Sequence, residues 1–191
     1  MLNDRSSLLA YLSTRRSGKP RDLAGPGPSD EQLREMVSIA ARTPDHGKLA
    51  PWRFVIVPQD KRERLADIIK AAYLAEKPEA GRLELEAHVQ FATQAPALIV
   101  VLSTPKQSKI PLWEQELSAG AATMNLLHAA HALGFAGGWL TTWPAFNETV
   151  RDAFGGPQDK IAGFVFIGTP SQELDERPRP ALDEILSVWE G

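Results

Sequence analysis

The most apolar stretch of the chain, residues 117–134, limits the folds that this sequence can adopt. Its polar interruptions are Ser118, Asn125, His128 and His131, and alanine and glycine supply much of its bulk. A membrane-spanning helix needs about 20 predominantly apolar residues, so we interpret this stretch as a buried helix and not as a membrane span. Glu114 and Glu116 lie where the first turn of this helix is expected, a place where the helix dipole favours acidic groups, and Gly134 is a natural C-terminal stop.

The chain length favours one domain or a tight pair of domains, and the composition predicts a soluble, globular protein; we expect a single domain over residues 1–191. Hydrophobic residues make up 43% and charged residues 24% of the chain, which excludes a largely disordered or collagenous protein. The formal net charge of −3 argues against a surface built for nucleic acid or another polyanion. We therefore expect neither a nucleic-acid nor a membrane partner.

The chain contains no cysteine, which excludes disulfides, thiolate nucleophiles and iron–sulfur clusters. Any redox chemistry must then come from a bound cofactor. The first residues lack the cationic start and the unbroken apolar core of a signal peptide, so we expect a cytoplasmic protein.

The spacing of apolar residues predicts several helices and strands. Helices are expected over residues 7–14, about 30–42 and within 60–94, where Pro78 and Gly81 separate two helices of a solvated cover layer. Strands are expected over residues 52–57, 97–102, 138–143 and 161–167. Because these elements intermix without a regular βαβ alternation, the class is α+β.

The tail is expected to be an extended arm. Arg177-Pro178-Arg179-Pro180 contains two prolines, which disfavour a helix. We expect this arm to wrap a neighbouring subunit before residues 182–189 dock.

The common catalytic signatures are absent, and the histidine candidates are weak. His128 and His131 have the spacing of two metal ligands on one helix face, but no nearby carboxylate completes a set, so packed or hydrogen-bonded histidines are the favoured interpretation. Asp45 and His46 are a candidate orienting pair for a general base, although no nucleophile accompanies them. A loop histidine that contacts a ligand is the favoured interpretation of His46.

Arg15-Arg16-Ser17 is a more informative cluster. Two guanidiniums and a hydroxyl offer the donors that suit a phosphate monoester or an anionic ring edge. A pair of solvated arginines that complement a helix dipole is the alternative. A nucleic-acid site would include Lys19 and Arg21, but no aromatic residues are interleaved there.

Five segments, taken in order, resemble the nitroreductase family of flavin enzymes, particularly its compact single-domain branch. They are Arg15-Arg16-Ser17; Arg42-Thr43-Pro44-Asp45-His46 followed by Pro51-Trp52-Arg53-Phe54; residues 113–120 (Trp-Glu-Gln-Glu-Leu-Ser-Ala-Gly); Gly134-Phe135-Ala136-Gly137-Gly138-Trp139; and residues 164–170. Together they extend over nearly the whole chain.

The resemblance implies an α+β homodimer with FMN bound noncovalently at the subunit interface, a mainly antiparallel sheet of four or five strands flanked by helices, and a C-terminal arm. The residues that it assigns to FMN are Arg15, Arg16 and Ser17 at the phosphate-bearing tail and the polar ring edge, Arg42 and His46 from the loop before the first long strand, Trp139, Leu140 and Thr141 near the isoalloxazine, and Arg179 at the phosphate. No metal is implied. Two departures bear on substrate choice: Lys48 stands where many members have a polar amide, and the loop over residues 104–112 is short.

The implied activity is that of an FMN-dependent oxidoreductase that passes hydride from NADH or NADPH, in a ping-pong reaction, to an electron-poor small molecule such as a nitroaromatic or a quinone. A flavin supplies this chemistry itself, so no catalytic acid–base pair is required. A cation near the pyrimidine edge favours the anionic reduced flavin; either Arg15 or Arg16 has this role, or both bind only phosphate. The alternatives are a flavin enzyme specialised for one metabolite and a flavin-binding protein without turnover.

Overall fold

The computed structural model describes residues 1–191, which divide into two compact units. The smaller unit joins Met1–Arg16 to Glu173–Gly191, and the larger unit is Ser17–Gln172. The single domain expected over residues 1–191 stays a prediction.

The larger unit is built on an antiparallel sheet of five strands. The strands are β1 (Leu23–Ala24), β2 (Trp52–Ile56), β3 (Ala97–Ser103), β4 (Ala136–Leu140) and β5 (Lys160–Pro170). β5 pairs with β3 along one edge and with β4 along the other, β2 lies outside β3, and β1 pairs with the end of β5. The predicted α+β class and antiparallel sheet are therefore confirmed.

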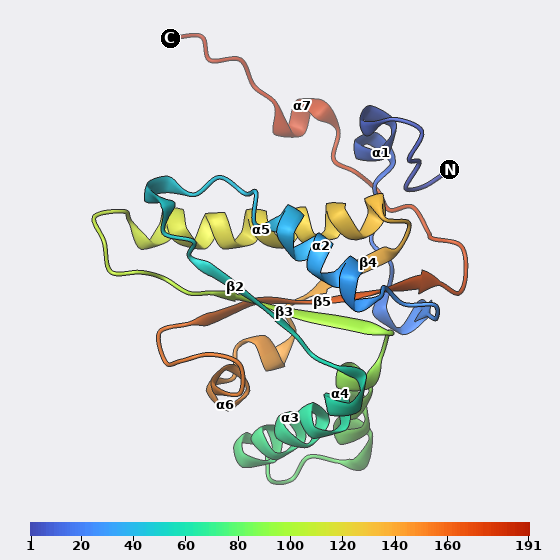
Figure 1. The fold of residues 1–191 in the computed structure, drawn as a ribbon, viewed down its shortest axis with the longest axis vertical. Helices are drawn as coiled ribbons and strands as arrows, with labels where there is room; N and C mark the ends of the chain where they lie inside the picture. The colour runs from blue at the N-terminus through green and yellow to red at the C-terminus, as the bar shows by residue number, and fades with distance from the viewer. The chain divides into compact units, whose positions relative to one another are not determined.

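Helices cover both faces of this sheet (Figure 1). Side chains of α2 (Asp30–Ala40) and α5 (Leu112–Ala132) pack with Ile99 and Val101 of β3 on one face. Side chains of α3 (Arg62–Glu76) and α4 (Arg82–Thr93) pack with Leu98, Val100 and Leu102 on the other. Successive strand residues point to opposite faces, so β3 is buried along its whole length and forms the centre of the core.

Local signals explain where the helices begin and end. At α2, Ser29 Oγ accepts from the Gln32 backbone N–H at 3.2 Å and Gln32 Oε1 accepts from the Ser29 N–H at 2.9 Å, which completes a capping box. The chain turns out of α5 at Gly134, whose φ of 95° suits glycine. No helix combines the length and the apolarity needed to cross a bilayer.

The helix predicted around residues 117–134 is α5, and Glu114 lies in its first turn, as expected. α5 begins at Leu112, directly after Pro111, because a proline just before the first turn costs no hydrogen bond. One sequence-predicted boundary was wrong. The strand predicted over residues 138–143 is β4, which ends at Leu140 and is followed by the 3₁₀ helix η4 (Trp143–Ala145). Pro144 has no N–H for a strand ladder, which favours this early end.

The smaller unit contains α1 (Leu8–Thr14) and α7 (Leu182–Ile185). Ser7 Oγ caps α1 by accepting from the Ala10 N–H at 3.0 Å. Residues 173–181 form neither helix nor strand, as expected for an extended arm. Beyond the arm, the Ile185 and Trp189 side chains are 67% and 90% exposed, so the docking of residues 182–189 on a neighbouring subunit stays a prediction.

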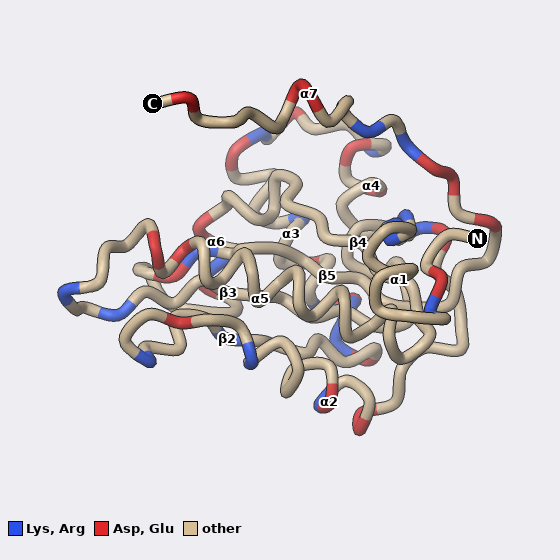
Figure 2. The backbone as a smooth tube through the Cα atoms, turned by 90° about the horizontal axis from the view of Figure 1, so that it is seen from above, with Lys and Arg blue, Asp and Glu red and all other residues tan.

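Basic and acidic residues are interspersed along the chain (Figure 2).

Candidate functional site

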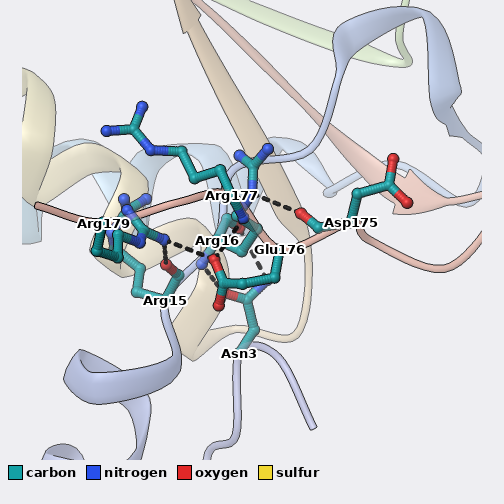
Figure 3. A network of polar contacts seen from close by, with 7 residues as sticks. All are labelled: Asn3, Arg15, Arg16, Asp175, Glu176, Arg177 and Arg179. Atoms are coloured by element: carbon teal, nitrogen blue, oxygen red, sulfur yellow. Dashed lines mark hydrogen bonds and ion pairs between the residues drawn. The ribbon is translucent and has the colours of Figure 1, made fainter.

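Arg16 is held in the smaller unit by contacts with both ends of the chain (Figure 3). Its backbone N–H donates to Asn3 Oδ1 at 2.8 Å, and Asn3 Nδ2 donates back to the Arg16 carbonyl at 3.0 Å. The Arg16 Nε donates to the Asp175 carbonyl at 2.7 Å. The N-terminal segment therefore fixes the backbone of Arg16, while the C-terminal arm fixes its guanidinium.

Arg179 joins the same network. Its Nη2 donates to Glu176 Oε1 at 3.0 Å and to the Arg15 carbonyl at 3.4 Å. The Arg177 backbone N–H also donates to Glu176 Oε1, at 2.8 Å, and this bond is the main reason that the pKa of Glu176 is lowered, with Arg179 and Arg16 adding to it. The structure thus brings together Arg15, Arg16 and Arg179, three residues that sequence analysis assigned to one ligand.

Ser17 begins the larger unit, where the chain runs along β4. The Gly18 N–H donates to the Gly137 carbonyl at 3.0 Å. A Cβ on Gly138 would lie 2.6 Å from the Gly18 carbonyl oxygen, so only glycine at residue 138 lets the two backbones approach. Ser17 therefore adjoins the start of the Gly-Gly-Trp segment.

Trp139 and Leu140 of β4 point to opposite faces of the sheet. Trp139 packs with the core on the α2 and α5 face, and its Nε1 donates to the Ala162 carbonyl at 2.9 Å. Leu140 packs with the core on the α3 and α4 face. Thr141 follows the strand and is exposed. Because the Leu140 side chain points to the opposite face, a ligand on the face that carries the Trp139 indole could contact Leu140 only through its backbone.

The loop over residues 43–51 is anchored to α5 by side-chain hydrogen bonds. Asn125 Nδ2 donates to Thr43 Oγ1 at 2.7 Å, and Ser118 Oγ donates to the Pro44 carbonyl at 2.9 Å. Trp52 Nε1, where the loop ends, donates to the same Ser118 Oγ at 3.2 Å. The anchored loop fixes the backbone around two exposed predicted residues, Arg42 and His46.

His46 belongs to the 3₁₀ helix η2 (His46–Lys48), and its partner differs from the one that the sequence indicated. His46 Nδ1 lies 2.7 Å from Glu114 Oε2, in the first turn of α5. Asp45 does not orient the imidazole, because its Oδ2 accepts from the Ala50 N–H at 2.6 Å. Sequence analysis gave Glu114 only a helix-dipole role, since 68 residues separate it from His46.

Of the other two histidine candidates, His128 and His131, the second is a hydrogen-bonded core residue. It is 1% exposed, and its Nε2 accepts from the Gly137 N–H at 3.2 Å. The ring thus fixes the start of β4, in agreement with the favoured interpretation from the sequence. No group of three His, Cys, Asp or Glu residues could hold a metal ion.

The structure therefore places the predicted residues in separate groups. Arg15, Arg16 and Arg179 form one network in the smaller unit. In the larger unit, Ser17 adjoins β4, which carries Trp139, while Arg42 and His46 lie on or beside the anchored loop.

Comparison with known proteins identifies relatives along most of the chain. The model of the Nitroreductase family matches residues 12–169. A protein of Escherichia coli strain K12 named "Putative NAD(P)H nitroreductase YdjA" is 37% identical over 164 residues, which are 85% of this chain and 87% of that protein.

Solved structures share the fold. A nitroreductase-like family protein from Bacillus cereus superposes with a TM-score of 0.82 at 19% identity, and the alignment covers 100% of both chains. A nitroreductase with bound FMN from Bacteroides fragilis superposes with a TM-score of 0.71 at 22% identity, over 97% of this chain and 100% of that one.

Proposed function

Because the chain belongs to the nitroreductase family, we propose that it is an FMN-dependent oxidoreductase that uses NADH or NADPH as its reductant. The observation that carries this proposal is the 37% identity, over 85% of the chain, to the relative named "Putative NAD(P)H nitroreductase YdjA". When bound, FMN would supply the chemistry of hydride transfer from reduced nicotinamide to an electron-poor acceptor, such as a nitroaromatic or a quinone, in a ping-pong cycle. The protein's part is to bind and orient the reactants.

The donors of the smaller unit fit the phosphate of FMN. A phosphate ester is recognised best by charge-assisted hydrogen bonds from planar guanidiniums, and this network contains the guanidiniums of Arg16 and Arg179 together with the backbone of Arg15. Glu176 is the carboxylate that pairs with Arg179, which leaves the three-arginine network net positive. We assign this network to the phosphate.

The groups of the larger unit fit a flat, largely apolar ring with a polar edge. Trp139 offers an aromatic surface whose orientation is fixed by its bond to the Ala162 carbonyl. Ser17 and the backbone after Leu140 offer short polar groups, and Arg42 and His46 offer donors from an exposed loop. We assign these residues, with Thr141, to the isoalloxazine and the chain that links it to the phosphate.

We also propose that the active form is a homodimer with FMN bound at the subunit interface and with both chains contributing to its binding. Leu8, Leu9 and Leu12 of α1 are 73%, 76% and 52% exposed, and such clustered apolar side chains mark an interaction surface. Sedimentation or light scattering at several concentrations tests this assembly. The cytoplasm remains the proposed compartment.

The deciding experiment for the activity is to purify the protein, record its visible spectrum and identify the released chromophore. We expect FMN, or its uptake by flavin-free protein, and anaerobic bleaching by NADH or NADPH. Flavin that nicotinamide cannot reduce would favour a binding protein without turnover. Protein that takes up no FMN would overturn the proposal. A screen of acceptors would then separate a broad reductase from an enzyme of one metabolite.

A further inference from the structure

Two adjacent residues in the first turn of α5 hold two different loops. Glu114 contacts His46 of the loop over residues 43–51, with 2.7 Å between Oε2 and Nδ1. The next residue, Gln115, is buried and makes three hydrogen bonds to the backbone of the loop over residues 104–111. This one helical turn therefore fixes both loops.

The two loops also touch one another. A Cβ added to Gly47, which follows His46, would lie 3.2 Å from Ile110 Cγ1, so the isoleucine side chain packs directly against the Gly47 backbone. The φ of Gly47 is 81°, a conformation that suits glycine. Both α5 and the second loop thus hold the backbone that carries His46. Only the side-chain torsions of His46 are left to set the orientation of its imidazole.

The chemistry of the Glu114 contact decides which nitrogen of His46 carries a proton. An ionised carboxylate can only accept, so His46 Nδ1 must be the donor across the 2.7 Å contact. A neutral imidazole has a single N–H, which leaves Nε2 as an acceptor. In the protonated ring Nε2 becomes a donor, and Glu114 supplies the opposite charge. In both states Nε2 is the nitrogen that can meet a ligand.

We propose that Glu114 is a positioning residue that fixes the Nδ1–H tautomer of His46 and so makes Nε2 the ring nitrogen that contacts the bound flavin. The identity of the ligand rests on the proposed function, whereas the tautomer does not. The His46 and Glu114 side chains are 65% and 37% exposed, so both a ligand and solvent can reach the pair. Because the loop that carries His46 is anchored, forming the contact between His46 and Glu114 costs less conformational entropy.

The first measurement is the tautomer of His46 in flavin-free protein. Glu114→Gln keeps the size of the side chain, but an amide can either accept from Nδ1–H or donate to a bare Nδ1, so it no longer selects one form. Long-range ¹H–¹⁵N spectra at a pH where the ring is neutral distinguish the tautomers, and His46→Gln identifies the signals. We expect the Nδ1–H form in the wild type and a shift toward the Nε2–H form in Glu114→Gln.

The matched control is Glu116→Gln, which removes a carboxylate two residues further along α5. Glu116 Oε1 pairs with Lys160 Nζ at 2.6 Å and has no contact with His46. This variant should keep both the Nδ1–H tautomer and the affinity for FMN.

The second measurement is the dissociation constant of FMN, from the quenching of flavin fluorescence. Glu114→Gln should raise it about 2- to 10-fold, as expected for one misplaced hydrogen bond. In a His46→Gln background the same substitution should add nothing, because Glu114 acts through His46.

The outcomes separate this inference from the proposed function. An unchanged tautomer in Glu114→Gln overturns the inference, and so does an FMN affinity equal to that of the wild type. If the wild type itself takes up no FMN, the proposed function falls, and the tautomer comparison still decides whether Glu114 sets the protonation of His46.

Discussion

Gly163 of β5 faces the indole of Trp139 on β4, and a Cβ at residue 163 would overlap the indole nitrogen. The same nitrogen donates to the carbonyl of the preceding residue, Ala162, at 2.9 Å. The missing side chain at residue 163 therefore fixes the place of the aromatic surface that we assign to the flavin ring.

Gly163→Ala should consequently displace Trp139. We expect a loss of about 1–3 kcal/mol in the free energy of unfolding, typical of overpacking a filled site, together with weaker FMN binding. Urea unfolding and flavin titration measure the two effects. Gly156→Ala is the control, because nothing lies within 4 Å of its added Cβ. If the two variants had equal free energies of unfolding and equal FMN affinities, the missing side chain at residue 163 would not determine the position of Trp139.

Arg15→Ala should weaken FMN binding without unfolding the protein. Loss of one charge-assisted hydrogen bond costs about 1.5–3 kcal/mol, or about 10- to 150-fold in the dissociation constant. Arg34→Ala removes an exposed arginine of α2 and should leave the dissociation constant unchanged. If Arg15→Ala binds FMN as tightly as the wild type, Arg15 does not contact the phosphate.

Arg62 is a buried guanidinium that lies outside all the candidate residues. It is 2% exposed, and it donates from Nε to the Val57 carbonyl at 2.9 Å and from Nη1 to the Ala92 carbonyl at 3.1 Å. Burial lowers its pKa to about 10. Because it joins the end of β2 to the end of α4, its role is structural.

Arg62→Lys should therefore destabilise the fold, since one ammonium cannot reproduce the planar donors that reach both carbonyls. We expect a loss of about 1–3 kcal/mol, the cost of an unsatisfied buried acceptor. Unfolding by urea provides the measurement, with the exposed neighbour Arg64→Lys as the control. A loss no larger than that of the control would show that the two carbonyls find other donors.

Glu84 should make stability depend on pH in the acid range. Its carboxylate accepts from Lys77 Nζ at 2.5 Å, from the Gly81 N–H at 3.0 Å and from the Tyr73 hydroxyl at 3.0 Å. The first of these contacts is the main cause of a pKa near 2, against an ordinary value of 4.5. A carboxyl with a lower pKa in the folded state stabilises the fold at neutral pH and loses this effect as the pH falls from about 4.5 to about 2.

Glu84→Gln should thus be less stable than the wild type at pH 7, and the gap between them should shrink as the pH is lowered toward 2. Urea midpoints at pH 7, 4 and 3 test this trend. Glu86→Gln on the same helix removes an exposed pair with Arg82 and should change stability at pH 7 by less than about 1 kcal/mol. A gap between Glu84→Gln and the wild type that stays constant would contradict the assigned contacts.

Local sequence signals were sufficient to predict most elements of the fold. The continuous apolar runs of β3 and β5 predict strands that are buried in a core. The capping pair of Ser29 and Gln32 predicts the start of α2. The break between α3 and α4 followed from Pro78 and Gly81. β1 was missed because two residues carry no periodic pattern.

The candidate site was less accessible to sequence reasoning, because its contacts join distant residues. Arg179 and Arg15 are 164 positions apart, and only the family resemblance put them on one ligand. The opposite facing of Trp139 and Leu140 follows from the alternation of a strand and could have been predicted. The pairing of His46 with Glu114 could not, since it depends on how the loop lies across α5.

The pairing order of the sheet has a consequence for biosynthesis. Three of the four strand pairings involve β5, which is the last strand to leave the ribosome. Until residue 170 has emerged, β3 can pair only with β2, and its other edge presents an unbroken apolar segment. Between the synthesis of residue 103 and that of residue 170, a nascent chain of this protein therefore carries an aggregation-prone edge, and chaperone holdases that cover such edges should raise its yield.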